Sequence, residues 1–337
     1  MRRFAIALAL LLPAYAASAQ CVADLSGDRK VSGADIGILL GEWGTAGGNT
    51  GADIDGNGIV SGSDLGAMLG AWGYCPVTVP SWATLIEERP DPAVVTNPEL
   101  RTAIEATGLA WRVRDTATQI EMLLIPPGTF QMGCIMGSNS WGCYSQELPV
   151  HQVTLTNAFY LGRYEVTQAQ WQARMGSNPS AFQGANRPVD TVSWTTIQGY
   201  LSATGMRLPT EAEWEYACRA GTQTPFYNGS MDDNTVGALA WYAPNSGSQT
   251  HAVGGKAANG FGLHDVLGNV SEWVNDWYGT YQSGTQTDPS GPASGSVRLS
   301  RGGAWNFDTF WVRSTSRDGV TPSDVYNFVG FRVARNP

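Results

Sequence analysis

Acidic and hydroxyl side chains recur at alternate positions in two short stretches near the N-terminus. The first stretch starts at Asp24 and the second at Asp53, 29 residues later. Side-chain oxygens at loop positions 1, 3, 5 and 12, together with a backbone carbonyl at position 7, form a donor set that suits Ca²⁺. The residues at these positions are Asp24, Ser26, Asp28, Lys30 and Asp35 in the first copy, and Asp53, Asp55, Asn57, Ile59 and Asp64 in the second. The sequence therefore predicts two calcium loops.

The two loops resemble EF-hands, and their paired format with aspartate at position 12 resembles a type I dockerin. Position 6 is Gly58 in the second copy but Arg29 in the first, which departs from the EF-hand pattern. The resemblance covers residues 22–73. It implies a small all-α, EF-hand-type module and a cohesin-like protein as its partner. The helices nevertheless lack the basic residues that often contact cohesin in dockerins.

Five cysteines are the other residues with obvious chemistry. Cys21 and Cys75 bracket the repeated segment, and Cys134 and Cys143 enclose a Gly/Ser-rich loop, so two disulfides are expected. Cys218 is left over, and its position in a helical pattern favours a buried, unreactive thiol over a reactive one. Disulfides suit an exported protein.

The N-terminus carries an export signal. Two arginines precede an apolar run, and Ala17-Ser18-Ala19 forms a cleavage site of small residues. We therefore expect a secreted chain, extracellular or periplasmic, that starts near Gln20. Its net charge of -9 excludes nucleic acid and anionic membranes as partners, because both require a basic face.

The remaining pattern predicts the elements that position these residues. Heavy use of glycine (41) and tryptophan (13) indicates many turns and large aromatic anchors in an α+β fold with little regular structure. Four helices are expected, at 97–108, 167–175, 193–205 and 210–221, each beginning at a capping residue or capping box. Residues 111–133 read as two strands around a polar turn. The predicted organisation is a signal peptide (1–19), the paired loops (20–75), a linker with a short helix (76–109) and a large domain (110–337).

Within the large domain, several motifs resemble the sulfatase-modifying factor family, whose reference member is the formylglycine-generating enzyme. They are "EMLLIPPGTFQMG", "PVDTVSW", "GMRLPTEAEWEYACRAG", "GFGLHDVLGNVSEW", "RGGAW" and "GFRVAR", in that order across residues 118–335. The resemblance implies an elaborated C-type-lectin-like fold.

The family's oxidase activity uses copper(I) held by two cysteines after the RGG motif, and this chain departs from that pattern. Phe307 stands at the first of those positions, Val312 follows without a thiol, and Ala304 replaces the motif serine. Soft thiolates suit copper(I), so the sequence argues against copper. It also argues against iron, because His151, His251 and His264 occupy three separate motifs. A formylglycine-generating-type oxidase or a related non-haem metal oxidase stays open as the alternative.

By the same resemblance, the loop "HDVLGNVSEW" implies a further calcium site. The ligands would be the side chains of Asp265 and Glu272 and the carbonyls of Gly268 and Val270. An ion-free turn is the alternative.

The segment between the RGG and GFR motifs could present a ligand surface for a glycan or a peptide. The candidates are Asn306, Asp308, Arg313, Arg317, Asp318, Asp324, Tyr326 and Asn327. The alternative is that the aromatic residues are core and the others a solvated rim. The leading hypothesis is thus a calcium-binding recognition protein without oxidase activity.

Overall fold

The computed structural model describes residues 21–135 and 142–337 and divides the chain into two units, Met1–Thr78 and Val79–Pro337. The predicted export signal lies outside the described residues. Among the helices of the described part, none is long and apolar enough to cross a membrane.

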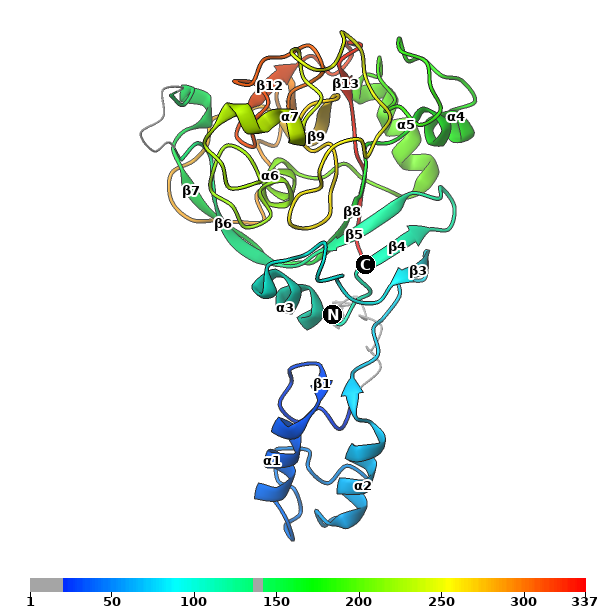
Figure 1. The fold of residues 1–337 in the computed structure, drawn as a ribbon, viewed down its shortest axis with the longest axis vertical. Helices are drawn as coiled ribbons and strands as arrows, with labels where there is room; N and C mark the ends of the chain where they lie inside the picture. The colour runs from blue at the N-terminus through cyan, green and yellow to red at the C-terminus, as the bar shows by residue number, and fades with distance from the viewer. Residues whose placement is uncertain (1–20, 136–141) are drawn as a thin grey trace, which may run out of the picture. The chain divides into compact units, whose positions relative to one another are not determined.

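The N-terminal unit is built from two equivalent halves. Helices α1 (Gly33–Gly41) and α2 (Gly62–Gly70) each follow an acidic loop, and the two-residue strands β1 (Lys30–Val31) and β2 (Gly73–Tyr74) pair antiparallel (Figure 1). The buried core consists of three pairs of residues at the repeat spacing: Ala23 with Ala52, Val31 with Val60, and Leu39 with Met68. The disulfide Cys21–Cys75 joins the two ends, as expected. The repeat in the sequence is therefore a repeat in the packing.

A five-stranded antiparallel sheet forms one part of the large unit. Its strand order is β14 (Ala334–Arg335), β8 (Phe159–Gly162), β5 (Glu121–Ile125), β4 (Arg112–Asp115) and β3 (Ala83–Glu87). Helix α3 (Pro98–Ala106) starts at the Asn97 cap as expected. The expectation that residues 76–109 are a linker was wrong for most of this range. Strand β3 extends the sheet, and Val95 and Ile104 are buried.

Two smaller sheets complete the β structure. One has the order β12 (Arg317–Val320), β11 (Arg298–Arg301), β9 (Ser271–Trp277) and β13 (Val329–Gly330). The other has the order β10 (Gln286–Thr287), β7 (His151–Leu155) and β6 (Gly128–Met132). Strand β6 corrects the expectation of two strands in residues 111–133. The Pro126-Pro127 step ends β5, and the chain continues into a third strand that belongs to another sheet.

The expected capping residues start the main helices. Thr167 caps α4 (Gln168–Met175), Ser193 caps α5 (Trp194–Thr204) and Thr210 caps α6 (Glu211–Arg219). Two short helical turns, η1 (Ser145–Glu147) and η2 (Asp233–Thr235), and helix α7 (Val236–Leu239) lie in the connecting loops. The unit is thus a mixed α+β fold in which loops make up much of the chain.

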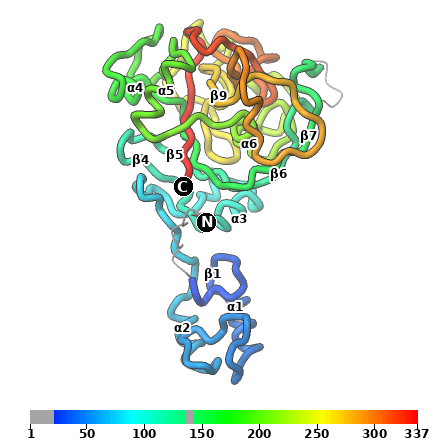
Figure 2. Tube along the Cα trace, turned by 180° about the vertical axis from the view of Figure 1, so that it is seen from behind, coloured from blue at the N-terminus to red at the C-terminus, as the bar shows by residue number. Residues whose placement is uncertain are grey.

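Helix α6 lies in the middle of the large unit, against β6, β9 and β11 (Figure 2). Its Glu215 is fully buried and accepts hydrogen bonds from Arg219, Arg301 and the Gly133 backbone N–H. Its Glu211 accepts two hydrogen bonds from one edge of the Arg317 guanidinium group, from Nε at 2.5 Å and from Nη2 at 2.8 Å. Burial by itself would raise the pKa of Glu215, but Arg219 and Arg301 outweigh it and hold the pKa below its ordinary value. These ion pairs connect α6 to β11 and β12.

Replacing Glu215 with glutamine should destabilise the protein strongly, because two buried guanidinium groups lose their counter-charge. We expect a loss of about 3–5 kcal/mol in the free energy of unfolding, measured with urea. The matched control is Glu87→Gln. The Glu87 side chain pairs with Arg112 but is 38% exposed, so this variant should lose less than about 1 kcal/mol in the free energy of unfolding. Equal losses in the two variants would contradict this role for Glu215.

Candidate functional site

The RGG frame turns tightly against two other parts of the chain. Gly302 has a φ of +92°, and a Cβ at Gly303 would lie 2.7 Å from the Trp311 carbonyl oxygen. Both positions therefore require glycine. The neighbouring cavity, lined in part by Ser271, Phe307 and Trp311, has a volume of about 10 Å³. That is room for about one water molecule.

No pair of thiolates is available at this frame. Four of the five cysteines form the disulfides Cys21–Cys75 and Cys134–Cys143, and Cys218 is free and fully buried. Burial raises the pKa of the Cys218 thiol to about 12. Cys218 is therefore buried, as predicted. The cysteines of this chain do not supply a pair of free thiolates beside the RGG frame, which is the ligand set that copper(I) would need.

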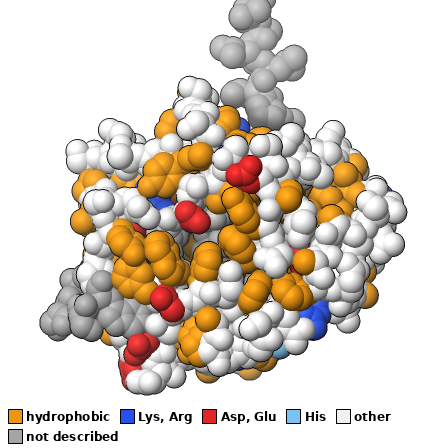
Figure 3. All heavy atoms as spheres, turned by 90° about the horizontal axis from the view of Figure 1, so that it is seen from above, with side chains coloured by type: hydrophobic (Ala, Val, Ile, Leu, Met, Phe, Trp, Pro, Cys, Tyr) orange, Lys and Arg blue, Asp and Glu red, His pale blue; other side chains and the backbone are white. Residues whose placement is uncertain are grey.

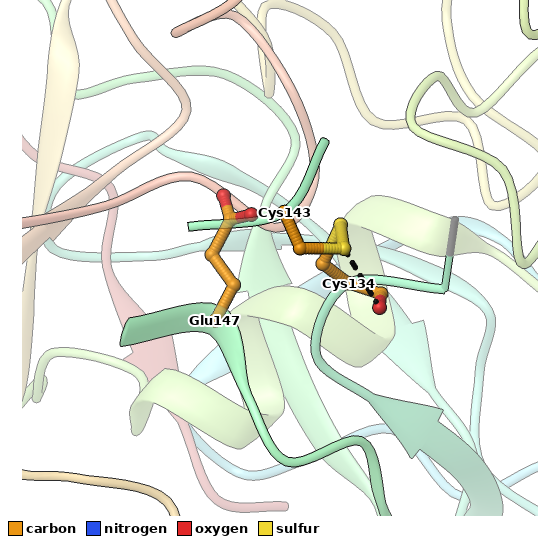
Figure 4. Close-up of side chains that lie close together, drawn as sticks. All are labelled: Cys134, Cys143 and Glu147. Carbon is orange, nitrogen blue, oxygen red and sulfur yellow. Dashed lines mark hydrogen bonds between the residues drawn. A yellow bond between two sulfur atoms is a disulfide. The ribbon is translucent and has the colours of Figure 1, made fainter. Parts of the chain in front are cut away.

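Cys134, Cys143 and Glu147 lie together, but their chemistry is not that of a metal site. Figure 4 shows the two sulfur atoms bonded to each other beside the Glu147 carboxylate. Both residues of the Glu147–Arg313 ion pair have fully buried side chains, with an N–O distance of 2.8 Å. The sulfurs and the carboxylate are thus already engaged, and the group has a structural role.

The three histidines make separate contacts. His151 Nδ1, His251 Nε2 and His264 Nδ1 each lie within hydrogen-bond distance of a backbone carbonyl, those of Pro149, Ser246 and Lys256 respectively. Within residues 21–135 and 142–337, no group of three metal-ligating side chains that converge contains a histidine. The histidines therefore do not form the triad that iron would need.

Partly exposed aromatic side chains from the segment after the RGG frame lie together, and Tyr144 from another part of the chain packs on them. We call this group the aromatic surface: Tyr144, Phe307, Phe310, Trp311, Tyr326 and Phe328. Tyr326 stacks on Phe328 with ring centroids 5.0 Å apart, and Phe328 contacts Phe307 at 5.3 Å. Tyr144 packs edge-on against Phe310 and stacks on Trp311. Figure 3 looks onto the end of the unit that carries β12 and β13 and shows hydrophobic side chains gathered there, with several acidic and few basic side chains among them.

The structure divides the predicted ligand residues into two groups. Asn306, Asp308, Asp318 and Tyr326 are exposed, and Asp324 and Asn327 are half-buried. Arg313 and Arg317 were expected on the exposed face, and that expectation was wrong. Both are buried, because Arg313 forms an ion pair with the buried Glu147 and Arg317 forms one with the buried Glu211. The exposed and half-buried residues of the predicted set are thus aromatic, amide and acidic.

In the loop "HDVLGNVSEW", the two predicted acidic ligands differ in their surroundings. Asp265 is buried with a φ of +53°, and its Oδ1 has no hydrogen-bond partner. Burial raises the pKa of Asp265 to about 6. Both oxygens of Glu272 are already bonded, to Arg332 and to the Trp214 indole N–H. An unpartnered buried oxygen at Asp265 fits a cation, whereas Glu272 has a counter-charge of its own.

Glu165 is a third acid near this loop that sequence reasoning missed. It accepts hydrogen bonds from the Asn269 amide, at 2.7 Å, and from the Val270 backbone N–H. Burial, together with the charges of Asp265 and Glu272, raises the pKa of Glu165 well above its ordinary value. Its position just before the Thr167 cap gave no signal in the sequence, because the contact spans about a hundred residues.

The two acidic loops bring their carboxylates together as predicted. Ligand atoms of Asp24, Asp28 and Asp35 lie within 4.8 Å of one another, and so do those of Asp53, Asp55 and Asp64. Backbone N–H groups of Ser26 and Ser32 outweigh burial and hold the pKa of Asp35 low, and the Asp55 N–H contributes most to the lowered pKa of Asp64. In the described ranges, none of these six acids pairs with a basic side chain. A hard cation fits this donor set.

Comparisons with known proteins identify the large unit. Residues 112–337 match the family model described as a sulfatase-modifying factor enzyme 1-like domain. The mouse formylglycine-generating enzyme is 34% identical over 200 residues, which cover 55% of this chain and 53% of the mouse protein. A chaperone protein LppX from Paenibacillus barcinonensis is 31% identical over 249 residues, covering 57% of this chain and 80% of that protein. The chain thus spans about half the length of the mouse enzyme.

Solved structures of the same fold carry other names. PvdO from Pseudomonas aeruginosa superposes with a TM-score of 0.60 at 28% identity, covering 67% of this chain and 98% of PvdO. Treponema denticola variable protein 1 gives a TM-score of 0.59 at 30% identity, covering 65% of this chain and 95% of that protein. Because enzymes and proteins with quite different names share the fold, the fold does not fix an activity.

The native protein should neither expose a reactive thiol nor retain copper(I). At pH 8 a thiol with a pKa of about 12 is ionised in roughly one molecule in ten thousand, so iodoacetamide should leave Cys218 unmodified until urea unfolds the chain. Mass spectrometry should then show one labelled cysteine per chain without reductant, and none in Cys218→Ala. In a titration against a competing copper(I) chelator we expect no stoichiometric binding. Labelling of the native protein, or tight copper(I) binding, would contradict the assignment.

Proposed function

The chain belongs to the sulfatase-modifying factor enzyme 1-like family, and we propose that this member is a recognition protein and not an oxidase. One observation carries the proposal: Phe307 and Val312 stand after the RGG frame where the family's oxidase chemistry needs thiolates, and every cysteine is disulfide-bonded or buried. Both disulfides are typical of a protein that folds outside the cytoplasm, which agrees with secretion. The competing function, a formylglycine-generating-type oxidase, would require a metal ligand set that these residues do not supply.

The aromatic surface is where recognition would take place. Its rings are partly exposed and support one another edge-on or stacked, so a ligand meets a preformed face. Asn306 and Asp308 add directional hydrogen-bonding groups at its edge, and both are exposed. Stacking combined with directional polar groups suits a sugar or a peptide strand. We therefore assign a glycan or a peptide as the class of ligand.

Truncating the aromatic surface should reduce binding without unfolding the protein. We expect Tyr326→Ala and Asp308→Ala each to weaken the strongest hit from a glycan and peptide array by about 1–2 kcal/mol, or roughly five- to thirtyfold, measured by calorimetry. Both side chains are exposed, so thermal unfolding should change little. The matched control is Tyr74→Ala, which removes an exposed tyrosine from the N-terminal unit. Equal binding by Tyr326→Ala and Tyr74→Ala would count against this surface.

For the N-terminal unit we propose a dockerin-like module that binds two calcium ions. Each half gathers three carboxylates at the head of a helix, and the unpaired negative charge supports a cation in each loop. The two halves also expose equivalent large apolar residues, Leu40 and Leu69 in the two helices and Trp43 and Trp72 just after them. Exposed apolar residues on two equivalent helices support a docking role, and a cohesin-like protein is the partner that fits.

Removing calcium should destabilise the N-terminal unit selectively. Free calcium at a hundred times its dissociation constant would stabilise each loop by about 2.7 kcal/mol, so a chelator should lower the unfolding midpoint and the helical circular dichroism of residues 21–75. Asp24→Asn combined with Asp53→Asn should abolish this response. Glu42→Gln, an acid of the same unit outside the loops, should retain it. An unchanged spectrum and midpoint in chelator would refute the calcium loops.

A further inference from the structure

A pocket of about 380 Å³ opens in the large unit, at a place distinct from the aromatic surface. It lies between β7, the start of α6, the end of β9 and the loop that follows β9. Its volume is in the range of about 300–1,000 Å³ found for small-molecule sites. None of the sequence motifs pointed to it, because its lining comes from segments far apart in the chain.

The buried polar residues that line the pocket, Glu211, Asp276 and Arg317, form what we call its floor, and the charges of Glu211 and Arg317 neutralise each other. Glu211 holds Arg317 at 2.5 and 2.8 Å and also accepts a hydrogen bond from the Tyr281 hydroxyl at 3.2 Å. The Asp276 Oδ2 accepts the Glu211 backbone N–H at 2.9 Å. All of Glu211, Asp276 and Arg317 are buried and line the pocket. The floor therefore offers neither a free cation for an anionic ligand nor a free anion for a cationic one.

Asp276 is the unusual member of this floor. Burial, together with the charges of Glu211 and Glu213, raises its pKa to about 8, and the charge of Arg317 acts against them. At neutral pH Asp276 is thus mostly a carboxylic acid. A carboxylic acid both donates and accepts hydrogen bonds, as does a hydroxyl group of a ligand.

The walls and the rim differ from the floor. Met132, Trp277, Pro289 and Pro292 give apolar surface, and Thr280, Gln282, Gln286 and Ser290 place hydroxyl and amide groups around the opening. Apolar patches beside donor and acceptor groups match a ring that has C–H faces and hydroxyl edges. We propose that this pocket binds one neutral sugar residue. The proposal stands independently of the ligand of the aromatic surface.

Saturation-transfer NMR on the full chain tests the proposal at pH 7. The probes are methyl glycosides of glucose, galactose, xylose and N-acetylglucosamine, with methyl glucuronide and methyl glucosaminide as charged counterparts. We expect at least one neutral glycoside to bind more tightly than either charged one. Binding by none of the neutral glycosides, or tighter binding by a charged one, would overturn the proposal.

Matched variants of the exposed loop locate the site. Ser290→Trp places a large side chain at the opening and should weaken the neutral glycoside at least about tenfold, whereas Ser283→Trp, in the same loop but outside the lining, should not. Tyr326→Ala should also leave this binding unchanged, which separates it from the aromatic surface. Equal binding by Ser290→Trp and Ser283→Trp would place the ligand elsewhere and overturn the assignment.

The pH profile supplies a readout of Asp276 itself. As pH rises from 7 to 9 through the Asp276 pKa, the donor proton is lost and affinity should fall roughly tenfold. The charged groups that face Asp276 are Glu211, Glu213, Arg317 and Arg298. In Asp276→Asn the affinity should be flat between pH 7 and 9. A flat profile in the unaltered chain would overturn the role of Asp276.

Discussion

The buried ion pairs on helix α6 are the constraint on which the large unit depends. Glu215 and Glu211 each hold guanidinium groups from distant strands, and Glu215 binds Arg219 and Arg301 at once. Desolvating such charges is costly, and it is offset only when every charged group finds hydrogen-bond partners. Here Arg301 also donates to the carbonyls of Ser314, Thr315 and Ser316, so the ion pairs fix the path of the segment before β12. A fold with few long strands can hold loops in place in this way.

This arrangement explains how the same segment carries two kinds of residue. Arg313 and Arg317 point inward and bind acids on η1 and α6, while Asp308 and Tyr326 remain exposed. The buried arginines hold the backbone of this segment through their ion pairs. The aromatic rings of the same segment pack on one another at the surface. Binding surfaces gain affinity when they are ordered before the ligand arrives. A buried anchor beneath an exposed aromatic face is therefore consistent with recognition, although the arginines themselves touch no ligand.

Local signals in the sequence predicted local structure well. Thr167, Ser193 and Thr210 each satisfy free N–H groups at a helix start, so their helices could be placed from spacing alone, and the repeat at Asp24 and Asp53 predicted two equivalent halves. Long-range structure was harder to predict. Strand β3 is short and lies at a sheet edge, next to prolines that are typical of a linker. A charged residue such as Arg313 is predicted to be exposed unless its partner is known. Its partner, Glu147, lies 166 residues away in the sequence, so no local pattern connects the two. The pocket around Asp276 could not be predicted for the same reason.

The segment after the RGG frame contains no thiol, yet the glycines of the frame still have a structural reason. In an oxidase of this family the segment after the frame has to hold a metal and leave room for a substrate. Here Phe307 and Trp311 line a cavity of about 10 Å³, and their rings belong to the aromatic surface. Gly302 and Gly303 remain necessary, because the turn that they make is required by the backbone contacts with Val266 and Trp311 and not by the metal. The backbone contacts alone therefore give a reason for the two glycines, and a motif match by itself does not distinguish an oxidase from a binding protein.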